Sequence, residues 1–404
     1  MARLYLSPPY MGGAELEYVQ KAFEENWIAP LGPNVDAFEK EMKERIGCSE
    51  ALAVASGTAA IHLALRSLGV GKGDLVFCTS MTFIGSMTPV LYQGASPVFI
   101  DSEPGSWNMS PVALRRAFEW AAAKGKMPKA VIIVDLFGHP ADYASLLPIC
   151  EEYGVPVIED AAEALGAEYQ IRPCGKDEPC PEAPSCGYYK PCGTFGAVNV
   201  LSFNGNKIIT TSGGGMLLTE DKSARDKMLF WATQARDKAM HYEHTEYGYN
   251  YRMSNIVAGV GRGQMRLLDK KLQIRREIYE RYIAMLEGTE YHVKLDMPYA
   301  KPNHWLTVAS IDGADIYMVE KVVAFMNAHD IETRPAWKPL HMQPVFVEAP
   351  AFSELTTGIE PDTDIYAFTC AKLFDKGICL PSGDAMTIGQ QDTVCRLLKE
   401  ALAF

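Results

Sequence analysis

The 404-residue chain is longer than one hydrophobic core usually supports, so its length predicts two domains. Its composition, 48% hydrophobic and 22% charged, is typical of a globular protein, and its formal net charge of -12 argues against nucleic acid and anionic membranes as partners. We find no signal-peptide pattern at the N-terminus and no apolar run long enough to span a membrane, which predicts a cytoplasmic protein.

Helical and strand-like periods alternate from about residue 50. A helical pattern over 59–69 precedes short buried strands at 74–80 and 96–101, and two more strands, 129–135 and 155–160, each follow a helical stretch. This alternation predicts βαβ units, and hence an α/β fold with a mainly parallel sheet covered by helices.

Polar residues close several of these strands. Ligands of an open parallel sheet bind at the carboxyl ends of its strands. We therefore expect one rim of the sheet to carry the strand-closing residues Ser80, Thr82, Asp101, Asp135 and Asp160. For Asp101 and Asp135 we favour a structural role as strand-end carboxylates.

The pattern of strand-like and helical segments changes after a helical span at about 255–286. The strand-like stretches "HWLTVASID", "IETRPAW" and "ICLPSG" are then separated by two amphipathic segments, which predicts a smaller α+β domain. We place a large domain at 1–264, including a cysteine-rich insertion at 170–192, and a small domain at 265–404.

One lysine stands out in "NVLSFNGNKIITTSGGGML". Lys207 lies between an Asn-Gly-Asn turn and a β-branched run, Ile208 to Thr211, that reads as a strand and leads into three glycines. A lysine beside a turn is commonly just solvated, so this stretch alone leaves its role open. The glycines after it would allow a close approach of the backbone.

Two further features have alternative interpretations. In "ASGTAAIHLALRSL" a Ser-Gly-Thr turn opens a helix, which either presents free backbone amides to a phosphate or simply has Ser56 or Thr58 as its N-cap. Asp160 in "VIEDAAEALGA" either caps the next element or holds a protonated heterocyclic nitrogen. A lysine, an aspartate and a helix N-terminus are together the groups that pyridoxal phosphate (PLP) requires.

The chain resembles the PLP-dependent nucleotide-sugar aminotransferases, the DegT/DnrJ/EryC1/StrS family of the aspartate aminotransferase-like fold (fold type I). The resemblance runs in order through nine blocks: "LSPPYMGGAELEYVQKAF", "NWIAPLGPNVDAFEKEM", "ASGTAAIHLAL", "MTFIGSMTPV", "EDAAEALGA", "FNGNKIITTSGGGM", "GYNYRMSNIVAG", "IETRPAWKPLHMQPVF" and "GICLPSG". Within the family, "HYEHTEYGYNYRMSN" and "ETRPAWKPLH" are most similar to the C4 aminotransferase of UDP-N-acetylbacillosamine synthesis.

The resemblance implies roles for the cofactor residues. Lys207 would carry PLP as an internal aldimine and then move protons as general base and acid, while Asp160 would pair with the pyridine nitrogen. Phe83 would stack on the ring, and Glu163 would lie near its phenolic oxygen. The residues implied at the phosphate are Gly57, Thr58 and Ser202 of one subunit and Asn250 of its neighbour.

The same resemblance implies the substrates and the assembly. Candidate substrate contacts are Arg252, Trp337, Lys338 and His341. L-glutamate would donate its amino group to C4 of UDP-2-acetamido-2,6-dideoxy-4-ketohexose by a ping-pong route, in a homodimer with composite active sites. The alternative is another nucleotide-linked keto sugar, dTDP- or GDP-linked at C4 or a 3-keto sugar.

Competing functional classes are less well supported. A related dehydratase branch lacks the catalytic lysine that Lys207 would provide. A cofactor-binding regulator would need an attached DNA-binding module or a damaged site, and we see neither. A nicotinamide oxidoreductase would need a G-x-G-x-x-G motif after the first buried strand, which the sequence does not have.

The segment "QIRPCGKDEPCPEAPSCGYYKPC" departs from the family, whose members have a short loop there. Its cysteines are each separated by five residues: Cys174, Cys180, Cys186 and Cys192. Four thiolates could hold zinc or an iron-sulfur cluster, but structural zinc sites favour pairs two to four residues apart. A surface excursion without metal and redox pairing are the alternatives, and we assign no metal.

Overall fold

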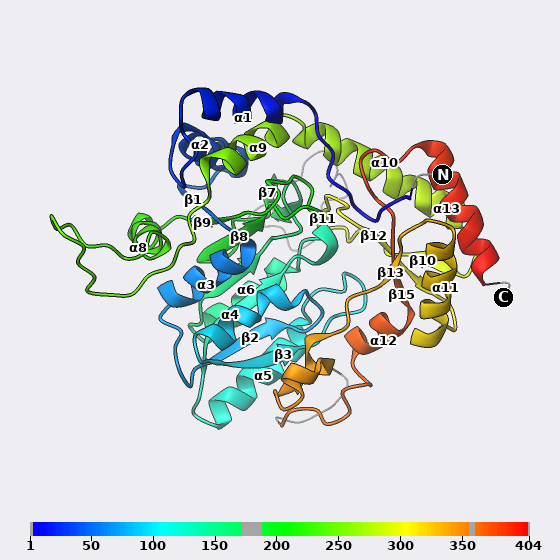
Figure 1. Cartoon of the computed structure of the whole chain (residues 1–404). Helices are drawn as coiled ribbons and strands as arrows, with labels where there is room; N and C mark the ends of the chain where they lie inside the picture. Colours follow the sequence, from blue (N-terminus) through cyan, green and yellow to red (C-terminus); the bar gives the residue numbers. More distant parts are fainter. Residues whose placement is uncertain (1–2, 172–187, 355–359, 403–404) are drawn as a thin grey trace.

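The computed structural model describes residues 3–171, 188–354 and 360–402. Its centre is a mixed sheet of eight strands in the order β1-β9-β8-β5-β4-β2-β3-β14 (Figure 1). In chain order these strands are β1 (Glu50–Val54), β2 (Leu75–Thr79), β3 (Ser96–Ile100), β4 (Pro128–Val134), β5 (Val157–Asp160), β8 (Val198–Ser202), β9 (Gly215–Thr219) and β14 (Ala351–Phe352).

The six strands from β8 to β14 run parallel, and β9 runs antiparallel to both of its neighbours, β1 and β8. Alternate residues of one strand enter opposite layers: Ile132 and Val134 of β4 pack in one hydrophobic cluster, and Val131 and Ile133 in another. Burial on both faces explains why these strands are continuously apolar. The predicted α/β fold of type I with a mainly parallel sheet is confirmed.

Helices cover both faces of the sheet (Figure 1). Apolar residues of α3 and α8 pack in one hydrophobic cluster with side chains from one face of the sheet. Those of α5 and α6 pack in a second cluster with side chains from the other face. The helices of this large body are α1 (Ala14–Glu24), α2 (Pro33–Ile46), α3 (Gly57–Ser67), α4 (Thr88–Tyr92), α5 (Pro111–Ala123), α6 (Tyr143–Glu152), α8 (Lys222–Ala232) and α9 (Asn255–Met265).

A second sheet, with order β10-β12-β15-β13, forms from the C-terminal part of the chain. Its strands are β10 (Tyr291–Val293), β12 (Thr307–Ile311), β13 (Arg334–Pro335) and β15 (Gly377–Leu380). The helices around it are α10 (Leu268–Leu286), α11 (Ile316–Ala328), α12 (Thr369–Lys376) and α13 (Ile388–Ala401) (Figure 1).

Two segments pack with the sheet that is formed mainly by the other part of the chain. The N-terminal segment lies with the second sheet, because Leu4 bridges Ile331 and the Ser382 amide donates to the Leu6 carbonyl (2.8 Å). Conversely, β14 extends the large sheet beside β3. The division at 264/265 falls at the end of α9, just before α10, and it stays a prediction.

A small third sheet flanks the insertion. It has the order β11-β6-β7, with β6 (Glu168–Ile171) antiparallel to both β11 (Ala300–Lys301) and β7 (Tyr188–Pro191). The paired strands β6 and β7 therefore lie directly before and directly after the central part of the insertion.

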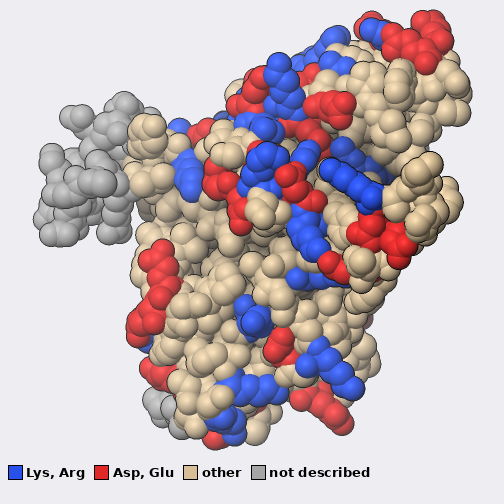
Figure 2. Space-filling model, turned by 90° about the vertical axis from the view of Figure 1, so that its left-hand side faces the viewer, with Lys and Arg blue, Asp and Glu red and all other residues tan. Residues whose placement is uncertain are grey.

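The surface carries charges of both signs. On the face shown in Figure 2, lysine and arginine side chains lie interspersed with aspartate and glutamate, without an extended basic patch. Among the described residues, no helix is both long and apolar enough to cross a bilayer.

Candidate active site

A cavity of about 400 Å³ lies at the carboxyl ends of β5 and β8, against the start of α3. Trp305, Arg334 and Trp337 close it from the C-terminal part of the chain. Seven of the eight predicted cofactor residues line it: Gly57, Thr58, Phe83, Asp160, Glu163, Ser202 and Lys207. Residues separated by up to 150 positions in sequence therefore meet in one cavity, where strand-end geometry predicts a ligand site.

Lys207 follows a tight turn, in which its amide donates to the Asn204 carbonyl (3.1 Å). Its side chain is only 12% exposed, and its Nζ lies 3.3 Å from Glu163 Oε1 and 3.9 Å from the centroid of the Trp305 ring. A merely solvated lysine would extend into water. Lys207 instead enters the cavity.

The prediction of a strand at Ile208 to Thr211 is wrong. These residues form a bend in the connection between β8 and β9, with the Thr211 amide donating to the Phe203 carbonyl (2.9 Å). β8 already pairs with β5 and β9 on its two edges, so no edge is free for another strand. Ile209 is nevertheless buried, and it packs in the hydrophobic cluster that contains Phe38.

The glycine run allows the close backbone approach that we expected. A Cβ atom on Gly215 would lie 2.5 Å from the Gly57 amide nitrogen, and one on Gly57 would lie 3.2 Å from Ser202 Cβ. The strand that follows Lys207 can therefore lie directly against the start of α3. Side chains at these two positions would push the helix end away from the cavity.

The N-terminus of α3 has both an N-cap residue and free backbone amides, the two features that the sequence offered as alternatives. Ser56 is the N-cap, with its Oγ accepting from the Ala59 amide (3.0 Å). The first two helical residues, Gly57 and Thr58, line the cavity, and their amides have no carbonyl within the helix to bond to. The cap thus leaves two donors for an anion at the positive end of the helix.

Asp160 closes β5 at the inner end of the cavity. It is buried, and its carboxylate accepts from Ser86 Oγ (2.7 Å) and from the Ala162 amide (3.2 Å). Burial raises the pKa of Asp160, and these hydrogen bonds, with the charge of Lys207, oppose that rise. A positively charged ligand nitrogen would compensate this buried carboxylate.

Glu163 is the ionic partner of Lys207. Its Oε2 accepts from the Phe137 amide (2.7 Å), and its Oε1 faces Lys207 Nζ. Burial raises the pKa of Glu163, while the Lys207 charge acts in the opposite direction. At the mouth, Phe83 lines the cavity with 65% of its surface exposed, so its ring is available to a ligand.

The structure places the predicted substrate residues apart from one another. Trp337 lines the cavity, whereas Lys338 is exposed outside it. Arg252 is turned toward Glu39 and the Ala53 carbonyl. The roles of these residues stay predictions.

His341 is buried beside β2 and does not line the cavity. Its Nδ1 accepts from Ser80 Oγ (2.6 Å) and its Nε2 donates to the Ile365 carbonyl (3.2 Å). Burial lowers its pKa to about 4, so the ring is neutral at pH 7. Its role as a substrate contact stays a prediction, and the same holds for the phosphate role of Asn250, which is exposed on the segment after α8.

Asp101 and Asp135 have structural partners. Asp101 accepts from the amides of Ser102, Thr369 and Cys370 and so caps the start of α12. Asp135 accepts from the Ala141 amide (2.9 Å) and Tyr143 Oη (2.8 Å). Neither lines the cavity; of the five residues expected at the rim, Thr82 and Asp160 do so.

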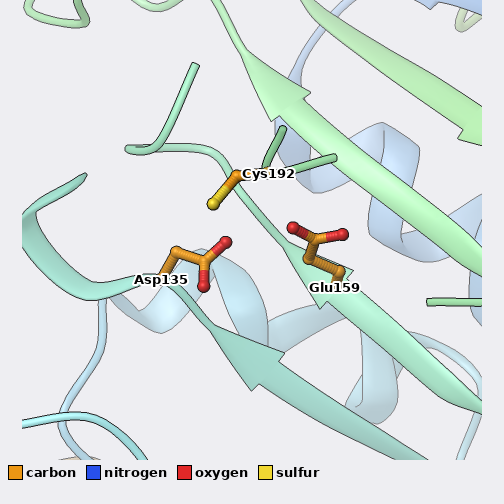
Figure 3. Close-up of side chains that lie close together, drawn as sticks. All are labelled: Asp135, Glu159 and Cys192. Atoms are coloured by element: carbon orange, nitrogen blue, oxygen red, sulfur yellow. The ribbon is translucent and has the colours of Figure 1, made fainter. Parts of the chain in front are cut away.

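The predicted metal ligands Cys174, Cys180 and Cys186 lie outside the described residues. The fourth, Cys192, is buried with its thiol beside the carboxyl groups of Asp135 and Glu159, as Figure 3 shows. Burial and these two acids raise the pKa of the Cys192 thiol well above its usual value. Without a metal ion, the Cys192 thiol is therefore neutral.

Several residues of the cavity were not singled out from sequence, among them Ser86, Trp305 and Arg334. Arg334 lies within the block "IETRPAWKPLH", and the only signal was an arginine three residues before a tryptophan. The others lack a pattern, because tertiary packing alone brings them to the cavity.

Comparison with known proteins agrees with this geometry. The sequence model of the DegT/DnrJ/EryC1/StrS aminotransferase family matches residues 9–399. The chain is 49% identical to "Putative pyridoxal phosphate-dependent aminotransferase EpsN" of Bacillus subtilis (98% of this chain and 95% of the relative), and 30% identical to the GDP-perosamine synthase of Vibrio cholerae (97% of each).

A solved structure shows the same fold. The crystal structure of a DegT DnrJ EryC1 StrS aminotransferase from Brucella abortus superposes with a TM-score of 0.82 at 26% identity, covering 96% of this chain and 95% of the other. With the family match over nearly the whole chain, these findings show that the protein belongs to the DegT/DnrJ/EryC1/StrS family and is a PLP-dependent aminotransferase.

Proposed function

We propose that the enzyme transfers the amino group of L-glutamate to C4 of UDP-2-acetamido-2,6-dideoxy-4-ketohexose by a ping-pong route. The observation that carries the amino transfer is the position of Lys207. Its amine is held inside a cavity that also contains a buried carboxylate, Asp160, and a helix N-terminus at Gly57.

The cavity fits PLP. Asp160 would hold the pyridine nitrogen, Phe83 would cover the ring, and Gly57, Thr58 and Ser202 would hold the phosphate. The close approach of Gly57 to Ser202 supports this assignment, because a Cβ atom at Gly57 would fill the space before the helix amides. PLP supplies an electron sink for the bond changes at the substrate carbon.

Lys207 would move the proton at that carbon. Its Nζ lies between the Glu163 carboxylate and the face of Trp305, so the amine has few positions open to it once it is released. Glu163 would hold the ammonium form of Lys207, and it would also lie near the phenolic oxygen of the cofactor. General acid-base transfer of this kind typically contributes about 10²- to 10⁴-fold to the rate.

Two acceptors compete. The resemblance of "HYEHTEYGYNYRMSN" and "ETRPAWKPLH" to the bacillosamine aminotransferase supports the UDP-linked 4-keto sugar. The GDP-perosamine synthases among the relatives, 30–33% identical, support a GDP-linked 4-keto sugar as the second candidate.

We further propose a homodimer with composite active sites. The segment after α8 extends away from the body of the chain (Figure 1), and it exposes Met240, Tyr242 and Tyr247. Asn250 follows on the same segment, bridged to Thr233. Burying these apolar side chains against a second copy would bring Asn250 toward the phosphate of the partner.

The test uses ¹⁵N-labelled L-glutamate with each keto sugar in turn, and mass spectrometry of the products. We expect ¹⁵N in an amino sugar formed from the UDP-linked substrate. Labelling of the GDP-linked sugar alone would move the function to the second candidate, and labelling of neither would contradict both acceptors.

A further inference from the structure

The peptide bond that joins Asn206 to Lys207 is held at both of its polar ends. Its carbonyl oxygen accepts hydrogen bonds from Ser7 Oγ (2.8 Å) and Trp305 Nε1 (2.6 Å). Its amide, which belongs to Lys207, donates to the Asn204 carbonyl (3.1 Å). Because a peptide unit is planar, bonds at both ends fix its orientation, and with it the direction in which the Lys207 side chain leaves the turn.

Arg275 of α10 holds both of the donors to that carbonyl. Its Nη1 donates to the Trp305 carbonyl (2.6 Å), and its Nη2 donates to Ser7 Oγ (3.1 Å), whose own proton goes to Asn206. Trp305 is therefore fixed at its backbone by Arg275 and at its ring nitrogen by Asn206. The face of the same ring lies 3.9 Å from Lys207 Nζ, so the ring limits where the amine can lie.

Asp384 and Lys271 complete a buried cluster around Arg275. Asp384 Oδ1 accepts from Arg275 Nε (2.5 Å), and Asp384 Oδ2 lies 3.4 Å from Lys271 Nζ. The three side chains are only 1–3% exposed. A buried ion pair often stabilises a protein no more than apolar residues of the same volume would, so stability alone explains this cluster poorly. Each nitrogen of the guanidinium group instead has one acceptor, which fixes its plane and both bonds toward Ser7 and Trp305.

We propose that Arg275 positions Lys207 for the proton transfer of the amino-transfer reaction. This inference rests on the proposed function, in that Lys207 moves the proton at the substrate carbon. Arg275 does not line the cofactor cavity, so it is a positioning residue that acts through Ser7 and Trp305. Without its two bonds, both donors to Asn206 would be free to shift, and the Lys207 amine would occupy a wider range of positions.

The first test compares single turnovers of the wild-type, R275K and S7A holoenzymes with L-glutamate, followed by the absorbance of the bound cofactor. R275K keeps a charge beside Asp384, but a single ammonium group cannot reproduce the planar fork. S7A removes one donor to Asn206 and leaves the buried charges in place. A displacement of about 1 Å can slow a reaction about 100-fold, so we expect the limiting rate to fall about 10- to 100-fold in R275K and about 3- to 10-fold in S7A.

The form of the loss distinguishes positioning from a general loss of structure. Misplacement of Lys207 lowers the limiting rate and leaves the half-saturating concentration of L-glutamate unchanged, because the proton moves after the donor has bound. Partial unfolding would instead reduce the fraction of enzyme that reacts, and hence the amplitude of the absorbance change, at an unchanged rate.

A second readout does not depend on turnover. Hydrogen exchange of the Lys207 amide is measured in each holoenzyme by mass spectrometry, and we expect it to be about 3- to 10-fold faster in both variants, as for the loss of one hydrogen bond. The matched control is R116K. Arg116 of α5 is also a buried arginine, paired with Asp362 (3.0 Å), and it does not line the cofactor cavity. R116K should lose stability in urea yet keep the wild-type rate and exchange.

The outcomes separate this inference from the proposed function. If the wild type does not react with L-glutamate, the proposed donor fails, and the exchange of the Lys207 amide alone decides: faster exchange in the variants supports the inference, and unchanged exchange overturns it. If the wild type reacts, an R275K enzyme with the wild-type limiting rate overturns it, and so does a loss that appears only in the half-saturating concentration. If R275K does not fold, S7A replaces it under the same criteria.

Discussion

Substitution of Asp160 by asparagine removes the buried charge and keeps the shape of the side chain. In the structure this carboxylate is buried at the inner end of the cavity, with Ser86 and Ala162 as its hydrogen-bond donors. Neither donor carries a charge, so the cationic partner of Asp160 is expected from the cofactor. Breaking a buried ion pair by removing one partner costs about 3–5 kcal/mol.

This cost predicts the size of the effect. At about 1.4 kcal/mol per tenfold change, the Asp160→Asn enzyme should lose about 10²- to 10⁴-fold in kcat/KM for the amino transfer. The protein should still fold, because burial already raises the pKa of Asp160 and a neutral amide avoids that desolvation.

The assay follows the half-reaction with L-glutamate by the absorbance of the bound cofactor. The control is Asp135→Asn, since Asp135 is a buried carboxyl at the end of the neighbouring strand and lies outside the cavity. We expect the control to react like wild type. A loss below about fivefold in Asp160→Asn, with cofactor bound, would refute the assigned ion pair.

Three other variants test separate parts of the structure. Lys207→Ala should bind PLP without a covalent bond and lose multiple turnover; sustained product formation in this variant would remove the proposed role. Gly215→Ala should weaken PLP retention in dialysis, because its Cβ would lie 2.5 Å from the Gly57 amide nitrogen; unchanged retention would contradict the close approach. For Asp135→Asn, the free energy of unfolding in urea should increase relative to that of the wild type as pH rises, by up to about 1.4 kcal/mol per pH unit.

The sign of the last prediction follows from burial. Burial and the charge of Glu159 raise the pKa of Asp135 well above 3.8, whereas in the unfolded chain it ionises near that value. The folded wild type therefore holds a proton that the unfolded chain has lost. Its stability is full below about pH 3.8 and falls as pH rises toward the folded pKa, and asparagine removes that fall. A difference between the two proteins that is constant with pH would contradict the raised pKa.

The sequence predicted the fold and the centre of the cavity because both depend on local patterns. Continuous apolar runs such as 130–134 indicate strands buried on two faces, and Asp160, at the end of its strand, lies at the expected rim. Lys207 and the helix start at Gly57 could be singled out because a turn and an N-cap have short signatures, but their roles at the cofactor came from the family resemblance.

Other features depend on contacts that no local pattern carries. Ile208 to Thr211 has β-branched residues, yet the edges of β8 are already taken, so the segment packs as a bend. Ser80 follows a strand, as Thr82 does, but it bonds His341 and lies outside the cavity. Arg334 reaches the cavity only because two sheets are packed together, which single-sequence reasoning does not predict.

The most direct test of the account is to locate the cofactor on the chain. The holoenzyme is treated with borohydride, which fixes a lysine-bound PLP irreversibly, and the digested peptides are analysed by mass spectrometry. The account predicts the label on Lys207, the lysine that lies in the cavity with Asp160 and Glu163. A label on any other lysine, or none on a protein that retains PLP, would contradict it.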